Sequence, residues 1–121
     1  MNESRAPWPT EIRLKQDRRT LAVRFDDDVE HALPAEMLRV MSPSAEVQGH
    51  SAGQRKTVGG KRDVSIAAVD PVGNYAVRLT FSDGHNTGIF TWAYLRKLAD
   101  ERESLWSGYL AELKAKGVSR G

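Results

Sequence analysis

The chain contains no cysteine among its 121 residues. Disulfides, thiolate zinc ligands, iron–sulfur ligation and a cysteine nucleophile are therefore excluded for this sequence. Aromatic residues make up only 7% of the chain. No apolar run approaches the ~20 residues that span a bilayer. The first 15 residues carry charges and prolines but no apolar segment, so we expect no signal peptide, no membrane association and a cytoplasmic location.

Neither sign of charge dominates, because 18 Lys and Arg residues face 16 Asp and Glu residues, for a formal net charge of +2. So small an excess argues against a nucleic-acid partner. The 40% hydrophobic and 28% charged content is typical of a globular protein. The length predicts one domain over residues 1–121, with flexible ends at 1–7 and 117–121.

Alternation of apolar and polar residues predicts about five short strands. They are expected at residues 11–15, 20–25, 64–70, 74–81 and 87–92. Short polar or Pro-Gly links between them predict hairpins, and hence a small, mostly antiparallel sheet. The acidic run Asp26–Asp28 is interpreted as a solvated turn that ends the second strand, rather than as a cation site.

Helical patterns occur at two places. Pro34 is suited to the first turn of a short central helix that Pro43 stops. From Trp92 onward the apolar residues follow helical spacing, with an expected break at 100–103 and an end at Gly117. The predicted fold class is therefore α+β, with one short central helix and a helical C-terminus.

His85 lies in the turn 82–86 between two strand-like runs. Its default interpretation is an exposed turn residue, because the three histidines, His31, His50 and His85, have no metal-ligand spacing. Ser82, Asp83 and His85 supply the residue types of a Ser-His-Asp catalytic triad, but they are neighbours in one turn, and no GxSxG motif is present. We therefore expect no catalytic residue, no metal, no cofactor and no enzyme activity.

The segment 42–63 is expected to be a long loop rich in serine, glycine and basic residues. Its basic side chains surround Gly59-Gly60, and such a loop can contact phosphates or an acidic protein surface. It lacks the spacing of a P-loop, and no aromatic residue lies among the basic ones. Farther along, Trp106 and Tyr109 are candidates for a partner surface.

Three segments, at 38–50, 60–66 and 81–95, resemble the gamma-butyrobetaine hydroxylase-like N-terminal domain. The resemblance covers about residues 8–113. That family, of unknown function, occurs as stand-alone bacterial proteins, as the N-terminal domain of 2-oxoglutarate-dependent oxygenases of carnitine synthesis, and fused to P-loop ATPases of the iron–sulfur carrier type. The resemblance implies a stand-alone bacterial protein without catalysis, because iron and 2-oxoglutarate belong to the other domain of the oxygenases.

The resemblance also implies a degenerate zinc site. In the oxygenases, three cysteines and one histidine of this domain hold a structural zinc. The histidine matches His85, whereas the cysteines match Ser42, Ser44 and Val47, which are poor zinc ligands or none. If the fold is kept, hydrogen bonds among Ser42, Ser44 and His85 are expected in place of the metal.

Three functional hypotheses follow. The leading one is a non-catalytic interaction or accessory module with a protein partner, docking on an oxygenase or an iron–sulfur assembly protein. The alternative is a small-ligand or metal-binding protein that uses His50 and His85, and a weaker alternative is nucleic-acid binding through the basic loop. The candidate interaction patch comprises Ser42, Ser44, Glu46, His50, Arg55, Lys56, Lys61, Arg62 and His85.

Overall fold

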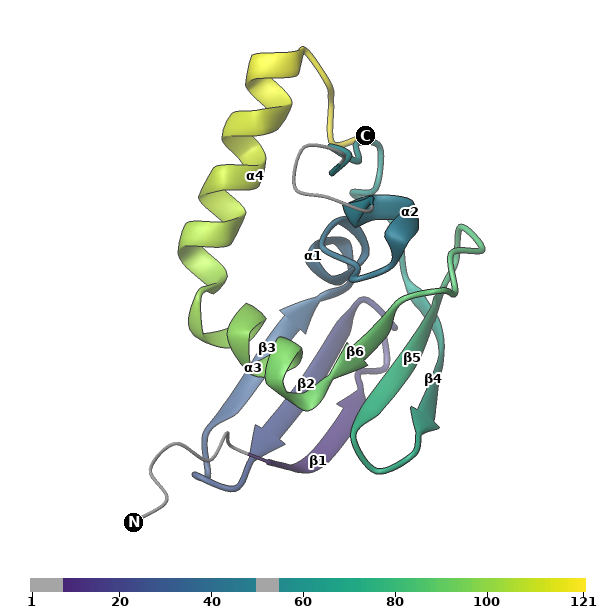
Figure 1. Ribbon diagram of the computed structural model, residues 1–121, viewed down its shortest axis with the longest axis vertical. Coiled ribbons are helices and arrows are strands. Elements are labelled where there is room, and N and C mark those ends of the chain that lie inside the picture. The colour runs from purple at the N-terminus through teal and green to yellow at the C-terminus, as the bar shows by residue number, and fades with distance from the viewer. Residues whose placement is uncertain (1–7, 50–54) are drawn as a thin grey trace.

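A computed structural model describes residues 8–49 and 55–121 (Figure 1). Within these ranges the chain forms two three-stranded antiparallel sheets, in the orders β1-β2-β3 and β4-β5-β6. The first sheet consists of β1 (Pro9–Leu14), β2 (Thr20–Phe25) and β3 (Glu30–Pro34). The second consists of β4 (Ile66–Val72), β5 (Ala76–Phe81) and β6 (Ile89–Thr91).

The α+β class is confirmed, but the strand β3 was not predicted. The acidic run Asp26–Asp28 forms the exposed turn that was predicted to end the second strand; the Asp28 amide donates to the Phe25 carbonyl, and Asp28 has a φ of 65°. The turn leads into β3, which pairs with β2. Only one side chain of β3, Leu33, is fully buried, so alternation along the strand is too weak to reveal it.

The helices follow the prediction with one addition. α1 (Ala35–Val40) begins after Pro34, and α2 (Ala45–Gln48) lies inside the segment expected to be loop. α3 (Trp92–Asp100) and α4 (Arg102–Lys116) meet at Glu101, within the predicted break. α4 ends at Gly117, whose φ of 65° lies in the left-handed region that favours glycine. No helix in the described parts of the chain is long and apolar enough to cross a membrane.

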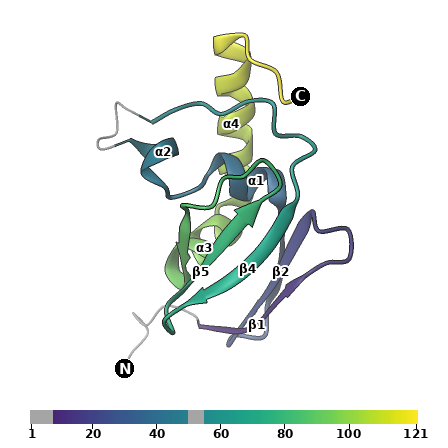
Figure 2. The same ribbon diagram turned by 90° about the vertical axis from the view of Figure 1, so that its right-hand side faces the viewer.

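One hydrophobic core joins the two sheets and the helices. The middle strands contribute fully buried side chains to it, Leu21, Val23 and Phe25 from β2 and Leu79 and Phe81 from β5. In Figure 1, α3 lies near β3 and β6, and α4 rises beside α1. Figure 2 shows the β4–β5 hairpin toward the viewer, with α1 and α2 above it. The sheets therefore support the two short helices at one end of the molecule.

The C-terminal end, expected to be flexible over residues 117–121, returns to the body of the protein instead. The amides of Gly60 and Arg62 donate to the carbonyls of Ser119 and Arg120, each at 2.9 Å. A side chain added at Gly59 would collide with Val118, so glycine is needed where the tail crosses the loop. The other expected flexible end, residues 1–7, lies outside the described residues.

We predict that Trp92→Ala destabilises the protein. Trp92 opens α3, packs against the core and donates its indole N–H to the Asn74 carbonyl at 2.8 Å. Because the ring is partly rather than fully buried, the expected loss is about 2–3 kcal/mol, at or below the lower end for buried aromatic residues. Urea unfolding would measure this loss of stability, and an unchanged urea midpoint would contradict the packing of Trp92 between sheet and helix.

Candidate functional site

His85 points into the protein rather than out of its turn. The turn after β5 closes through hydrogen bonds from Phe81 N–H to the His85 carbonyl and from Gly84 N–H to the Phe81 carbonyl, each 2.9 Å. Asp83 Oδ1 accepts the His85 amide at 3.1 Å, and Gly84 takes a φ of 91°. His85 is only 7% exposed. The default interpretation as an exposed turn residue is therefore wrong.

The segment that follows α1 meets this histidine. Ser42 is fully buried, and its hydroxyl lies 2.9 Å from His85 Nε2. The same hydroxyl oxygen accepts the Ser44 amide at 3.2 Å. Ser44 is the N-cap of α2, accepting the Glu46 amide at 3.1 Å, and its hydroxyl lies 2.7 Å from that of Thr87. The predicted contact between the two serines and the His85 turn is present.

Glu46 completes the arrangement from the first turn of α2. Its Oε1 lies 3.0 Å from His85 Nδ1, on the opposite side of the ring from Ser42. A carboxylate can only accept here, so Nδ1 carries the proton of the neutral imidazole and Nε2 accepts from the Ser42 hydroxyl. We call Ser42, His85 and Glu46 the His85 staple, because they join two segments of the chain, with Ser42 and His85 43 residues apart in the sequence.

A cluster of charges holds the same turn from outside. Asp83 Oδ2 lies 2.8 Å from Arg39 Nε of α1 and 2.6 Å from Lys61 Nζ of the long loop. Burial alone would raise the pKa of the Asp83 carboxyl, but hydrogen bonds from Lys61, the His85 amide and Arg39 outweigh it and hold that pKa well below its usual range. Asp83 is therefore ionised at neutral pH and keeps both cations in place.

The imidazole itself is kept neutral. Burial lowers the pKa of His85, and the nearby Arg39 guanidinium lowers it further. The carboxylates of Glu46 and Asp83 act in the opposite direction without reversing the shift. A neutral ring is the form that the staple requires, because Nε2 must accept the Ser42 proton.

The staple has the atom order of a hydrolytic Ser-His-acid triad, with serine on Nε2 and carboxylate on Nδ1. The hydroxyl of Ser42 is nevertheless closed off. Ser42 is 0% exposed, and Gly88 packs so closely on its Oγ that an added Cβ would collide with it. A substrate carbonyl has no approach to this hydroxyl, so the arrangement joins segments rather than presenting a nucleophile.

The residues do not fit the zinc that the resemblance implies for related domains. The Ser42 hydroxyl is already engaged by His85 and Ser44, and Val47 is a buried aliphatic side chain. Within residues 8–49 and 55–121, no group of three or more His, Cys, Asp or Glu side chains could hold a metal ion. The two serine positions that the resemblance matches to zinc ligands are instead linked to the His85 turn by hydrogen bonds, between Ser42 and His85 and between Ser44 and Thr87.

The rest of the candidate patch is dispersed. Arg55 turns toward α4 and pairs with Glu112 at 2.9 and 3.0 Å, whereas Lys61 joins the Asp83 cluster. The side chains of Lys56 and Arg62 are exposed. His50 lies outside the described residues. Of the basic patch residues that the structure describes, Lys61 contacts the turn that carries His85, through Asp83, whereas Arg55 is directed to α4.

Sequence reasoning missed Arg39, Asp83 and Gly88 as parts of this site. The sequence places Asp83 in the turn 82–86, where the structure also has it, and nothing in the local pattern around Arg39 distinguishes it from a solvated helix residue. Tyr109 was a candidate for a partner surface, but it is 2% exposed and donates its hydroxyl to the Val58 carbonyl at 2.6 Å. Helical spacing shows which residues share a face, not what covers that face.

The fold and the staple define a small α+β domain whose two loops are joined by buried hydrogen bonds. The chain belongs to the family described as gamma-butyrobetaine hydroxylase-like, N-terminal, whose model matches residues 12–96. The match lies within the 8–113 expected from the sequence. No curated protein matches the chain.

Solved structures share both fold and sequence. Two proteins studied in solution by NMR are 47% and 45% identical, each with a TM-score of 0.82. The chain matches over 94% and 99% of its length, and over 90% and 89% of theirs. A crystallised protein of unknown function from Acidithiobacillus ferrooxidans ATCC 23270, of the DUF971 family, is 47% identical with a TM-score of 0.62, over 75% of this chain and 91% of that one.

We predict that Gly88→Ala destabilises the protein by about 1–3 kcal/mol, the usual cost of forcing an extra carbon into a packed site. The added methyl group would displace the Ser42 hydroxyl from His85, since the two groups cannot share that space. The matched control is Gly108→Ala in α4, where nothing lies within 4 Å of the new carbon. It should stabilise by about 0.5–1 kcal/mol through helix propensity. Equal denaturation midpoints for the two variants would contradict the close packing at Ser42.

We further predict that acid destabilises the wild-type protein more than His85→Leu. The folded-state pKa of His85 lies below its ordinary value of 6.5. Below pH 6.5 the unfolded chain therefore takes up a proton that the folded protein refuses, and stability falls with pH until the folded pKa is reached. Melting temperatures between pH 8 and pH 5 would show a steeper decline for the wild type. Parallel curves would contradict a neutral, buried His85.

Proposed function

We propose that the protein is a non-catalytic, cytoplasmic interaction module that docks on a larger protein through the surface around His85. The family model carries the description of the N-terminal part of gamma-butyrobetaine hydroxylase-like proteins. A domain of a kind named as the N-terminal part of a larger enzyme is suited to dock on such an enzyme. We therefore propose an oxygenase or an iron–sulfur assembly ATPase as the class of partner.

The proposal rests on one observation. The inner part of the His85 staple is inaccessible, whereas the side chains of Glu46, Asn86 and Thr87 form a polar rim at the surface. Ser42 is inaccessible, whereas the side chain of Glu46 is 63% exposed while bound to His85. Asn86 and Thr87 are exposed in the same turn, and Thr87 is held by Ser44. A rim held by the protein itself loses little conformational entropy when a partner binds, which favours affinity and specificity.

Nucleic-acid binding receives less support from the same contacts. Arg55 is paired with Glu112 and Lys61 with Asp83, so two of the four basic loop side chains are neutralised within the protein. A phosphate backbone would have to displace those carboxylates. Metal binding through His85 would likewise have to break the staple, because both ring nitrogens are engaged.

Capture from a native lysate with matched variants tests the proposal. Asn86→Arg places a large cation on the rim, whereas Asn74→Arg makes the same change in the turn at the other end of β5. A partner recovered by the wild type should be retained by Asn74→Arg and lost by Asn86→Arg. With the purified partner, calorimetry should show binding weakened about tenfold or more by the rim variant.

Two outcomes would overturn the proposal. One is a capture that recovers the same proteins with both variants and the wild type, because the rim would then contribute nothing. The other is a partner lost through Asn74→Arg alone, which would move the interface to the opposite end of the second sheet. Both variants change exposed side chains, and an unchanged melting temperature would show that the fold is preserved.

A further inference from the structure

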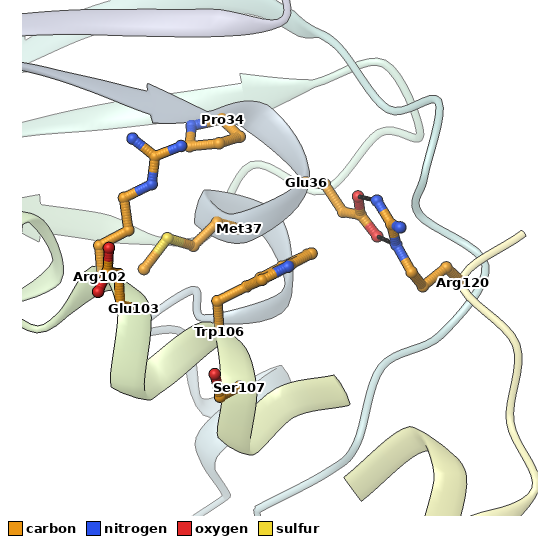
Figure 3. Close-up of a pocket in the computed structure, with 8 residues that line it drawn as sticks. All are labelled: Pro34, Glu36, Met37, Arg102, Glu103, Trp106, Ser107 and Arg120. Atoms are coloured by element: carbon orange, nitrogen blue, oxygen red, sulfur yellow. Dashed lines mark hydrogen bonds and ion pairs between the residues drawn. The ribbon is translucent and has the colours of Figure 1, made fainter. Parts of the chain in front are cut away.

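A cavity of about 470 Å³ lies between α1 and the first half of α4, away from the His85 staple (Figure 3). Its apolar lining consists of Pro34, Met37 and Trp106. Met37 is almost fully buried, whereas the Trp106 ring is partly exposed. A space of this size falls within the ~300–1,000 Å³ typical of small-molecule sites, and an apolar lining with a few polar groups is their usual composition.

One wall of the cavity is already saturated by contacts within the protein. Glu36 is 7% exposed, and its carboxylate accepts two hydrogen bonds from the Arg120 guanidinium, at 2.8 and 3.0 Å. The same guanidinium lies 5.4 Å from the centre of the Trp106 ring. This bidentate pair fixes the tail against α1 and orients the indole, but it leaves neither charge for a ligand.

The opposite side of the cavity offers a different cation. Arg102, the first residue of α4, donates from Nη1 to the Ala32 carbonyl at 2.6 Å, which holds its guanidinium beside Pro34 (Figure 3). Within residues 8–49 and 55–121, no carboxylate forms an ion pair with Arg102 by side-chain distance. A guanidinium has five N–H donors, and the bond to the Ala32 carbonyl uses one of them.

The charge of the ligand is limited by Glu103, whose side chain lines the same cavity. One arginine next to one glutamate favours a single negative charge, since a phosphate dianion would face repulsion from the carboxylate. The planar indole and the thioether of Met37 favour a flat apolar body next to that charge.

From these contacts we infer that the cavity between α1 and α4 binds a small aromatic carboxylate. The ring lies against Trp106 and Met37, and the carboxylate pairs with Arg102. This site is separate from the proposed docking surface, so either can fail without the other. Trp106 thus has a role in binding a small molecule rather than a protein partner.

Titration of the ¹⁵N-labelled wild-type protein with phenylacetate tests the inference. The signal of the Trp106 indole N–H, assigned from the spectrum of Trp106→Leu, should shift and saturate together with amides of residues 35–37 and 102–107. A Kd of about 1 mM is expected for so small a ligand. The neutral phenylacetamide has the same shape and should bind about tenfold more weakly, because it lacks the charge-assisted hydrogen bond.

Charge-matched variants locate the carboxylate. Arg102→Gln should abolish the preference for phenylacetate over phenylacetamide, whereas Arg78→Gln, an exposed arginine of β5 outside the cavity lining, should preserve it. Equal affinity of the wild type for the two probes, or a preference that survives in Arg102→Gln, would overturn the inference. So would the absence of saturable shifts up to 10 mM, or shifts confined to residues 82–88.

Discussion

The hydrogen bond between the Ser42 hydroxyl and the His85 imidazole ties the segment after α1 to the turn after β5. The other polar contacts of this region surround it. The Ser44 amide donates to the Ser42 hydroxyl, and the Ser44 side chain caps α2. Glu46, which belongs to α2, contacts the opposite ring nitrogen of His85. Asp83 joins the His85 turn to Arg39 and Lys61. The Ser44 and Glu46 amide bonds are local in sequence, whereas the contacts of His85 and Asp83 join distant parts of the chain. Together they hold two loops that the apolar core alone would leave unattached.

The magnitude of these interactions limits what they can do. A neutral hydrogen bond contributes about 0.5–1.5 kcal/mol net, whereas a structural zinc contributes on the order of 10–16 kcal/mol in small domains. Hydrogen bonds therefore cannot replace the folding energy of a metal. They suffice here because the two sheets and α1, α3 and α4 already share one buried core. The staple selects one arrangement of the loops, and leaving its buried imidazole nitrogen without a partner would cost about 1–3 kcal/mol.

Local sequence pattern predicted the strands and helices whose side chains alternate or repeat clearly. β2, β5, the junction between α3 and α4, and the end at Gly117 are of this kind. β3 and α2 were missed because β3 buries one side chain fully and α2 is a single turn capped by Ser44. The inward position of His85 was beyond local pattern, since the contacts that bury it come from Ser42 and Glu46. It was the resemblance to related domains that brought the serines and the histidine together in the prediction, while the cavity at Trp106 depends on a tail expected to be flexible.

The central claim is that Ser42 and His85 act as one structural unit, and a double-mutant cycle tests it most directly. Unfolding free energies of the wild type, Ser42→Ala, His85→Leu and the double variant give the coupling between the two side chains. The account predicts a coupling of about 1 kcal/mol or more, with the double variant less destabilised than the sum of the single ones. Additivity within about 0.3–0.5 kcal/mol would contradict it, because the two residues would then contribute independently.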